Sequence, residues 1–296
     1  MKSVNKAPKN HRVILFVNSV NKHARNLGDR IAKELVSLKF EVHTYSLKDE
    51  HKADIGAGYD IAISLGGDGT VLSASRAMSP LGVPIFPVNL GTFGFIAGIE
   101  PEEWRKVFEQ WLAGKAPISR RLMLEICVKR EGKEVYSGCG LNDIVISASG
   151  IAKVINLRVF YSEPGRKEIL KLGRYRSDGL IVSTPTGSTA YSASAGGPIV
   201  DPELDALIIN PICAFTLSNR PIVLPANEMV LVEVEEEQRS GVLLTVDGQV
   251  TEKLKSGDRV FLKKAPHPCL LVASGRTDFY ETLRTKLGWA GGGHYD

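Results

Sequence analysis

A glycine-rich loop with one acid at its centre is the segment of this sequence best suited to chemistry. It follows an apolar run at 61–65 and stands where a helical pattern begins. Its members are Gly66, Gly67, Asp68, Gly69 and Thr70. Glycines let the backbone turn tightly and present N–H groups to an anion, and a helix start adds partial positive charge. The loop therefore predicts a phosphate-binding turn.

Asp68 is the unexpected member of this loop, because a carboxylate repels phosphate. The two can share a site when a divalent cation lies between them or when the carboxylate takes up a proton, and both occur in phosphoryl transfer. The alternative is a plain strand–turn–helix connection that Asp68 caps. All six histidines lie outside the polar motifs of the chain, so acid–base work would fall on a carboxylate, with Asp68 leading.

A second glycine loop, NLGTFGF at 89–95, follows the next apolar run at 85–88. Both loops stand at the carboxyl end of a strand, where ligands of open α/β sheets bind. Phe93 either stacks on a base or packs in the interior, and its position alone favours neither role. The first loop is not a Walker A motif, because no Gly-Lys-Ser/Thr follows it.

The third motif is the segment DGLIVSTPTGSTAYSASAGGP at 178–198. Here a strand pattern runs into a turn, and a short helix is expected to begin near Ser188 and to end at Gly196. Small hydroxyl-bearing residues at a helix start bind phosphate or ribose, but they also simply allow close packing. Tyr191, an aromatic ring with a polar tip among small residues, favours a nucleotide site.

Two shorter motifs carry further carboxylates. Asn142-Asp143 precedes an apolar run at 144–146, and an amide beside an acid can hold vicinal ribose hydroxyls. An Asx turn is the commoner explanation for such a pair. Asp247-Gly248-Gln249 is first a hairpin turn, because Asp-Gly is a frequent turn sequence.

The elements that would position these motifs alternate between strand and helix over the first third of the chain. Short apolar runs predict strands at 11–18, 42–47, 61–65 and 85–88. Apolar residues at helical spacing predict helices at 24–40, 70–78 and 102–113. This alternation predicts a parallel sheet with right-handed crossovers.

The pattern changes to period two near Pro117. Alternating segments are found at 122–128, 155–161, 229–234, 242–246, 260–262 and 269–272. We therefore expect an α/β domain at 1–118 and a β-rich, antiparallel, sandwich-like domain at 119–275. A final helix at 278–287, within 276–296, is expected to return to the first domain.

Composition excludes several classes of protein. The chain has 296 residues, 43% of them hydrophobic and 24% charged, which is ordinary for a globular protein. The net charge of +4 comes without a block of Lys or Arg, so no nucleic-acid partner is expected. No apolar run is long enough to cross a bilayer, and the four cysteines lack zinc or redox spacing. We expect a cytoplasmic protein without a membrane partner.

The motifs resemble those of the NAD kinase family in order and in spacing. The likeness covers nearly the whole chain, and it is carried by the segments at 66–70, 89–95, 142–143, 178–198, 247–249 and 279–289. The glycine–aspartate loop alone also occurs in lipid kinases and phosphofructokinases. The segment at 178–198 is highly specific, and it distinguishes NAD kinases from those relatives.

The resemblance implies transfer of the terminal phosphoryl group of ATP, or of polyphosphate, to the 2′-hydroxyl of the adenosine ribose of NAD, which gives NADP. It implies Asp68 as the catalytic residue, a divalent metal such as Mg²⁺, NAD bound between the domains, and a homodimer or homotetramer. Donor phosphates would bind Gly66, Gly67, Gly69 and Thr70. The residues implied to bind NAD, or adjoining its site, are Gly69, Phe93, Asn142, Asp143, Arg176, Asp178, Thr189, Ala190, Tyr191, Ser194, Asp247 and Gln249.

One position departs from the usual family pattern. The family pair is usually Asn-Glu, so Asp143 is one methylene shorter than the usual side chain. The resemblance also implies that Arg176 affects the choice between NAD and NADH, with NAD preferred. Two other functions would use part of the same motifs. They are a lipid or sugar kinase that shares the loop at 66–70, and a non-catalytic NAD-binding protein that does not need Asp68.

Overall fold

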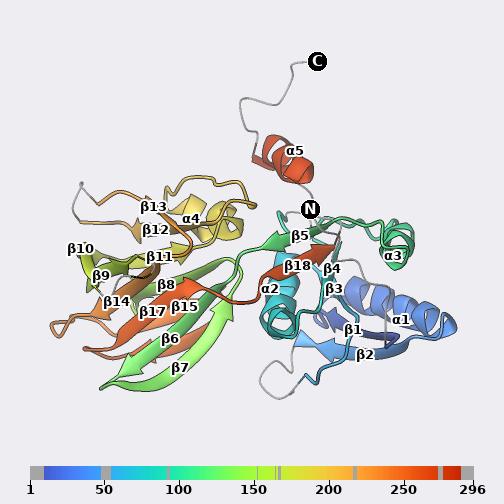
Figure 1. Cartoon of the computed structure of the whole chain (residues 1–296), viewed down its shortest axis with the longest axis horizontal. Helices are drawn as coiled ribbons and strands as arrows, with labels where there is room; N and C mark the ends of the chain where they lie inside the picture. The colour runs from blue at the N-terminus through green and yellow to red at the C-terminus, as the bar shows by residue number, and fades with distance from the viewer. Residues whose placement is uncertain are drawn as a thin grey trace. The chain divides into compact units, whose positions relative to one another are not determined.

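The structure is a computed structural model, and it describes residues 10–47, 55–91, 94–151, 153–163, 165, 168–215, 219–272 and 276–287. The chain folds as two units. One consists of Met1–Arg121 with His267–Asp296, and the other of Leu122–Pro266. Figure 1 labels the strands and helices of both units.

Apolar runs form the inner strands of a six-stranded sheet in the first unit, in the order β2-β1-β3-β4-β18-β5. The strands are β1 (Arg12–Val17), β2 (Glu41–Ser46), β3 (Ile61–Gly66), β4 (Ile85–Asn89), β5 (Ile118–Arg121) and β18 (Cys269–Val272). Pairing is parallel from β2 to β18, and β5 runs antiparallel to β18. Burial over the whole length of β3 is typical of a strand covered on both faces.

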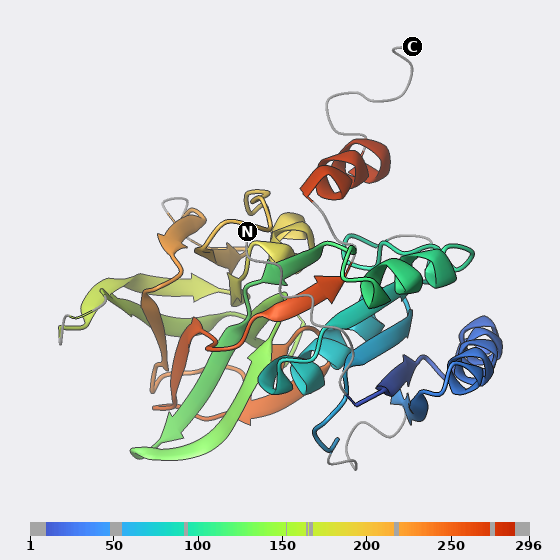
Figure 2. The ribbon, with the colours of Figure 1, turned by 45° about the vertical axis from the view of Figure 1, so that its right-hand side comes forward.

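Two helices cover opposite faces of this sheet. The chain leaves β1 through α1 (Lys22–Ser37) toward β2, and it leaves β3 through α2 (Asp68–Met78) toward β4. The first connection moves toward the β2 edge of the sheet and the second moves toward β4, in the opposite direction. Because both crossovers are right-handed, α1 and α2 lie on opposite faces of the sheet, as Figures 1 and 2 show. The direction of winding therefore reverses between β1 and β3, which is where open α/β sheets bind ligands.

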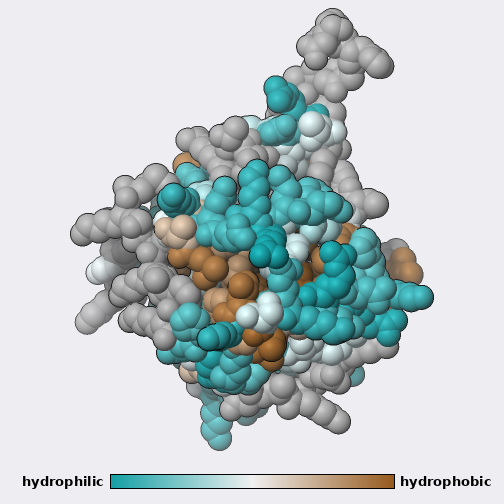
Figure 3. Space-filling model, turned by 90° about the vertical axis from the view of Figure 1, so that its right-hand side faces the viewer, coloured by the Kyte–Doolittle hydropathy of each residue, from teal (hydrophilic) through white to brown (hydrophobic). Residues whose placement is uncertain are grey.

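A cluster of aromatic rings fixes α3 (Trp104–Leu112) in the core of the first unit. Its residues Trp104, Phe108 and Trp111 are buried on one side of the helix. The Phe108 ring contacts both tryptophans and also the rings of Phe40 and Phe86. Figure 3 views this unit from the side on the right of Figure 1, where hydrophilic side chains surround a group of apolar ones. Within the described ranges, no helix is long and apolar enough to cross a membrane.

The second unit contains two six-stranded sheets in which all pairing is antiparallel, in the orders β10-β9-β14-β17-β6-β7 and β13-β12-β11-β8-β15-β16. The strands of the first sheet are β6 (Leu124–Arg130), β7 (Lys133–Gly140), β9 (Ile155–Ser162), β10 (Leu170–Ser177), β14 (Met229–Val234) and β17 (Arg259–Lys264). Those of the second are β8 (Asp143–Ala148), β11 (Gly179–Ser183), β12 (Ala206–Ile212), β13 (Ile222–Pro225), β15 (Val242–Val246) and β16 (Val250–Leu254).

Alternate side chains of both sheets meet in one core. Ile146 and Val182 from the second sheet belong to the same buried cluster as Val159 and Val232 from the first. This arrangement is a β-sandwich. The predicted fold class, a parallel α/β part followed by antiparallel β-structure, is confirmed.

The strand β18 differs from the sequence-based expectation. Its apolar run was expected in the second domain, but Leu271 pairs with Ile85 of β4 and with Ser119 of β5 in the first sheet. A short apolar run predicts a strand without specifying its partners, which explains the difference. The last helix, α5 (Arg276–Leu287), begins two residues before the predicted start at 278.

Replacing Phe108 with Ala should destabilise the first unit, because four aromatic neighbours lose their contacts with its ring. Removal of a buried aromatic side chain costs about 3 to 5 kcal/mol. Urea unfolding followed by the fluorescence of Trp104 and Trp111 measures this change. The matched control is Gln110→Ala on the exposed side of α3, which should stay within about 0.5 kcal/mol of the wild type. Equal stability of the two variants would contradict the described core.

Candidate functional site

The glycine–aspartate loop lies at the carboxyl end of β3, beside the point where the winding of the sheet reverses. Gly66 ends the strand and Asp68 begins α2. A Cβ atom on Gly66 would lie 2.1 Å from the Thr70 hydroxyl oxygen, so no larger residue fits there. Thr70 donates its backbone N–H to the Gly67 carbonyl oxygen at 2.9 Å. Gly69 is exposed, so the turn leaves backbone groups accessible at the start of a helix.

The Asp68 carboxylate is held by three consecutive backbone N–H groups, from the last residue of the second glycine loop and the two residues that follow it. Oδ2 accepts a hydrogen bond from Phe95 at 2.8 Å. Oδ1 accepts hydrogen bonds from Ile96 at 3.2 Å and from Ala97 at 3.0 Å. Hydrogen bonds of this kind fix the orientation of a carboxylate and stabilise its charge. Asp68 is therefore more than a helix cap, because it ties two loops together.

The segment that supplies these donors is itself anchored in the sheet. Ile99 lies in a parallel bridge with Val88, and its backbone bonds to Pro87 and Asn89. The apolar side chains at 96, 97 and 99 are buried. The second glycine loop also meets the first, because Leu90 donates its N–H to the Gly66 carbonyl oxygen at 2.9 Å. Phe93, which we expected at the substrate, lies outside the described residues.

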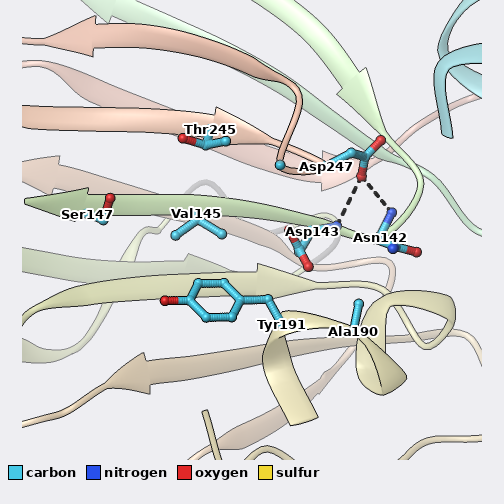
Figure 4. Close-up of a pocket in the computed structure, with 9 residues that line it drawn as sticks. Asn142, Asp143, Val145, Ser147, Ala190, Tyr191, Thr245 and Asp247 are labelled. Carbon is cyan, nitrogen blue, oxygen red and sulfur yellow. Dashed lines mark hydrogen bonds between the residues drawn. The ribbon is translucent and has the colours of Figure 1, made fainter. Parts of the chain in front are cut away.

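A cavity of about 300 Å³ lies on the outer face of the second sheet of the second unit, and Figure 4 shows it. Ile144 and Ile146 of β8 point into the sandwich core, so the alternate residues of that strand face the cavity. Figure 4 shows the Tyr191 ring beside the strand that carries these residues. The lining residues are Asn142, Asp143, Val145, Ser147, Ala190, Tyr191, Thr245, Asp247 and Gly248.

Asp247 shapes one end of this cavity from the turn between β15 and β16. Asp247 and Gly248 both have positive φ, 51° and 67°, and Gln249 donates its N–H to Val246, as in a type I′ hairpin. The predicted hairpin turn is thus confirmed. The Asp247 carboxylate accepts backbone N–H bonds from the first residue of β8, Asp143 (3.2 Å), and from the two residues before it, Leu141 (3.0 Å) and Asn142 (2.8 Å).

Asp143 carries a buried carboxyl group that points toward Ala190 and Tyr191 in Figure 4. Its side chain is 4% exposed, and no donor to its carboxyl group is found among the described residues. Burial, together with the nearby Asp247 carboxylate, raises the pKa of Asp143 from 3.8 to about 7. The amide oxygen of Asn142 is also buried without a partner among the described residues. Both groups are suited to a ligand that supplies hydrogen-bond donors.

The segment after β11 is pinned onto the start of β8 by small residues. A Cβ atom on Gly187 would lie 2.1 Å from the Asn142 carbonyl oxygen, so only glycine fits between them. Thr184 donates its hydroxyl to the Leu141 carbonyl oxygen at 2.6 Å. This close packing leads through a 3-10 turn (Thr186–Thr189) into α4 (Tyr191–Ser194). This segment therefore combines close packing with residues that line the cavity, Ala190 and Tyr191.

The structure brings together Asn142, Asp143, Ala190, Tyr191 and Asp247 among the residues expected at the substrate. The other expected residues of this unit are absent from the described lining of the cavity. They are Arg176, whose guanidinium lies over the Phe215 ring at 4.7 Å, the half-buried Asp178 and Thr189, and the exposed Ser194 and Gln249.

Four lining residues were not predicted from the sequence. Val145 and Ser147 share the outer face of β8 with Asp143. Thr245 lies on the adjacent strand β15, where it pairs with Val145. Gly248 completes the turn beside Asp247. The alternation of β8 and β15 contains the signal that could have found the first three, because each is out of phase with the core residues.

Comparison with known families matches both halves of the chain. Residues 4–116 match the family described as the ATP-NAD kinase N-terminal domain, and residues 141–274 match the ATP-NAD kinase C-terminal domain. The NAD kinase of Treponema denticola is 40% identical over 280 residues, which cover 94% of this chain and 96% of that protein. The NAD kinase of Aquifex aeolicus is 40% identical over 279 residues, which cover 94% and 99%.

Two solved structures share the fold. Yeast NADH kinase complexed with NADH matches with a TM-score of 0.82 and 24% identity, over 96% of this chain and 89% of that one. An NAD kinase from Archaeoglobus fulgidus in complex with ATP matches with a TM-score of 0.69 and 24% identity, over 92% and 98%. At this level of identity the likeness concerns the fold.

Replacing Asp143 with Asn should change the stability of the protein in a pH-dependent way. In the folded protein Asp143 stays protonated up to a pH of about 7, whereas in the unfolded chain it loses its proton near its ordinary pKa of 3.8. Between these two values the folded state binds the proton more tightly than the unfolded state does. The free energy of unfolding of the wild type therefore falls as the pH rises through this window. The stability of Asp143→Asn relative to wild type should therefore rise by about 2 to 3 kcal/mol between about pH 5 and pH 8.

Chemical unfolding at the two pH values measures this difference. Ser147→Ala, on the same face of β8 but without a titratable group, is the control, and its difference from wild type should not depend on pH. A pH-independent difference for Asp143→Asn as well would show that its carboxyl group is not the buried acid described.

Proposed function

The chain belongs to the NAD kinase family and phosphorylates NAD with ATP to give NADP, and we propose that Asp68 acts on the acceptor hydroxyl in this reaction. The observation that carries the proposal is the fixed carboxylate at the start of α2, at the carboxyl ends of the parallel strands. A carboxylate is a weak base toward an alcohol. Most of the rate would then come from alignment and charge neutralisation, with the proton of the ribose 2′-hydroxyl leaving late.

We propose that the first unit binds the donor phosphates. Gly66, Gly67, Gly69 and Thr70 would present backbone N–H groups to them, supported by the partial positive charge of the α2 start. The space required at Gly66 and the exposure of Gly69 support this assignment. ATP is the donor of the family, and polyphosphate would present similar phosphates to the same turn.

The residues fit a magnesium ion that arrives with ATP better than one bound by the protein alone. The described part of the chain contains no group of three or more His, Cys, Asp or Glu side chains arranged to hold a metal. Mg²⁺ is commonly held by substrate phosphates, water and one or two carboxylates, and Asp68 could supply one carboxylate. The ion would neutralise charge on the transferring phosphoryl group.

We propose that the second unit binds the dinucleotide through the cavity lined by Asn142, Asp143, Ala190, Tyr191 and Asp247. The buried amide oxygen of Asn142 and the carboxyl group of Asp143 suit the vicinal hydroxyls of a ribose. The other residues proposed to contact the substrate are Phe93, Asp178, Thr189, Ser194 and Gln249. Arg176 would affect the choice between the oxidised and reduced dinucleotide, with NAD preferred.

The proposal extends to the setting of the enzyme. We propose a cytoplasmic homodimer or homotetramer without nucleic-acid or membrane partners. The first unit would act as the donor-phosphate domain and the second as the NAD-binding domain.

Incubation of the protein with ATP, Mg²⁺ and NAD, followed by an assay for NADP, tests the proposed function. A lipid or sugar kinase would consume ATP only with its own acceptor, and a non-catalytic NAD-binding protein would retain NAD without forming NADP. Phosphorus NMR of the product identifies the phosphorylated hydroxyl. A product modified elsewhere than at the 2′-hydroxyl would refute the proposal.

Asp68→Asn should lower kcat by about 100- to 10,000-fold, the usual cost of removing a general base. The structure adds a second effect, because the Asn amide group cannot accept all three N–H bonds and would place an NH₂ group against one of those donors. We therefore expect some change at the glycine turn in this variant, while NAD binding in the second unit should persist. Steady-state kinetics and NAD titration measure the two effects. A kcat above about a tenth of the wild-type value would contradict a catalytic role.

Tyr191→Ala should weaken NAD binding more than it lowers kcat, because the ring lines the cavity while its side chain is 48% exposed. Loss of base or ring stacking costs about 1 to 3 kcal/mol, which corresponds to about a 5- to 150-fold rise in KM for NAD. Tyr191→Phe keeps the ring and is the control. If Phe and Ala gave the same KM, the hydroxyl rather than the ring would be the contact.

A further inference from the structure

Gly94, in the second glycine loop, lies directly against the Asp68 carboxylate. A Cβ atom on Gly94 would lie 2.6 Å from Asp68 Oδ1, 3.2 Å from Cγ and 3.5 Å from Oδ2. Contacts under 3 Å essentially never occur for a real Cβ, so any side chain at 94 would displace this carboxylate, Oδ1 first.

Backbone conformation does not explain why this residue is glycine. Gly94 is not among the glycines with positive φ, so its backbone lies in a region open to other residues. Gly94 is also buried, whereas Gly98, four residues later, is exposed and has open space around its ideal Cβ position. The space that the missing Gly94 side chain leaves is filled by Asp68 Oδ1.

The hydrogen bonds of Asp68 leave little of its carboxylate available. A carboxylate offers about four lone-pair directions. Oδ1 accepts two N–H bonds, from Ile96 and Ala97, and Oδ2 accepts one, from Phe95. With the donors of the described residues counted, the remaining acceptor direction is on Oδ2. The donors cannot follow a rotating carboxylate, because Ile96 and Ala97 are buried and Ile99 is bonded into the sheet.

We propose that Gly94 is a positioning residue for phosphoryl transfer. By leaving room for Oδ1, it lets three backbone N–H groups hold the Asp68 carboxylate so that Oδ2 alone meets the substrate. This inference rests on the proposed role of Asp68 in the reaction.

The variant Gly94→Ala adds one methyl group against Oδ1. A displacement of about 1 Å at a catalytic group can lower the rate about 100-fold. We therefore expect kcat to fall by about that factor, with KM for NAD changed by less than about threefold because the cavity of the second unit is not touched. Gly98→Ala in the same segment is the matched control and should keep the wild-type kcat. A kcat for Gly94→Ala within about threefold of wild type would overturn the proposal.

A double-mutant cycle with Asp68→Asn tests whether Gly94 acts through Asp68. If it does, Gly94→Ala should lower kcat strongly in the wild type but change it little in Asp68→Asn, because groups that act as a unit are not additive. An equal loss in both backgrounds would show an independent effect, such as general damage to the fold, and would refute the positioning role.

Amide proton shifts of Phe95, Ile96 and Ala97 give a readout that does not depend on activity. Gly94→Ala should move them toward their positions in Asp68→Asn, and Gly98→Ala should not. If Asp68→Asn turned over NAD like the wild type, the catalytic assignment of Asp68 would fall, while these shifts would still show whether Gly94 holds the carboxylate. If Gly94→Ala did not fold, the comparison of wild type with Asp68→Asn would still test the proposal. Equal amide proton shifts at 95–97 in these two proteins would show that the Asp68 carboxylate does not bind those N–H groups, and the proposal would be wrong.

Discussion

One interaction recurs at both sites and determines much of their local structure: a carboxylate that accepts three consecutive backbone N–H groups. Asp68 binds the residues at 95–97 in the first unit, and Asp247 binds those at 141–143 in the second. Burial of a carboxylate destabilises the folded protein unless hydrogen-bond donors surround it. Buried backbone N–H groups of a loop are likewise destabilising unless they are hydrogen-bonded to an acceptor. Each pairing satisfies both requirements and fixes a short segment of backbone.

Close contacts explain the glycines around each site. Gly94 and Gly187 are required because Asp68 and the Asn142 carbonyl group approach their backbones closely. Gly66 leaves space for Thr70 at the turn itself. Asp143 differs from Asp68 and Asp247, because the described residues supply no such donors to its carboxyl group. Burial and the nearby Asp247 carboxylate raise the pKa of Asp143 to about 7. The two sites thus contain two fixed carboxylates, those of Asp68 and Asp247, and one buried acid available to a ligand, that of Asp143.

Sequence reasoning could identify the motifs but not all the contacts between them. Period and composition predicted the strands β1, β2, β3 and β4 of the first sheet and the hairpin at Asp247, because these features are local. The hydrogen bond from the Asn142 backbone N–H to the Asp247 carboxylate joins residues 105 apart in the chain, and no local pattern specifies such a pairing. The same limit explains why β18 was assigned to the wrong sheet. Thr245, in contrast, was missed although the alternation of β15 carried its signal. The family resemblance supplied the role of Asp68, while its three N–H donors could be found only in three dimensions.

Hydrogen exchange at the two carboxylate-bound segments tests the central claim most directly. The exchange rates of the amides at 95–97 and 141–143 are measured in the wild type, in Asp68→Asn and in Asp247→Asn. The structure predicts that Asp68→Asn accelerates exchange at 95–97 alone and that Asp247→Asn accelerates it at 141–143 alone. Unchanged exchange at both segments would show that the carboxylates do not hold them, and the account of both sites would then be wrong.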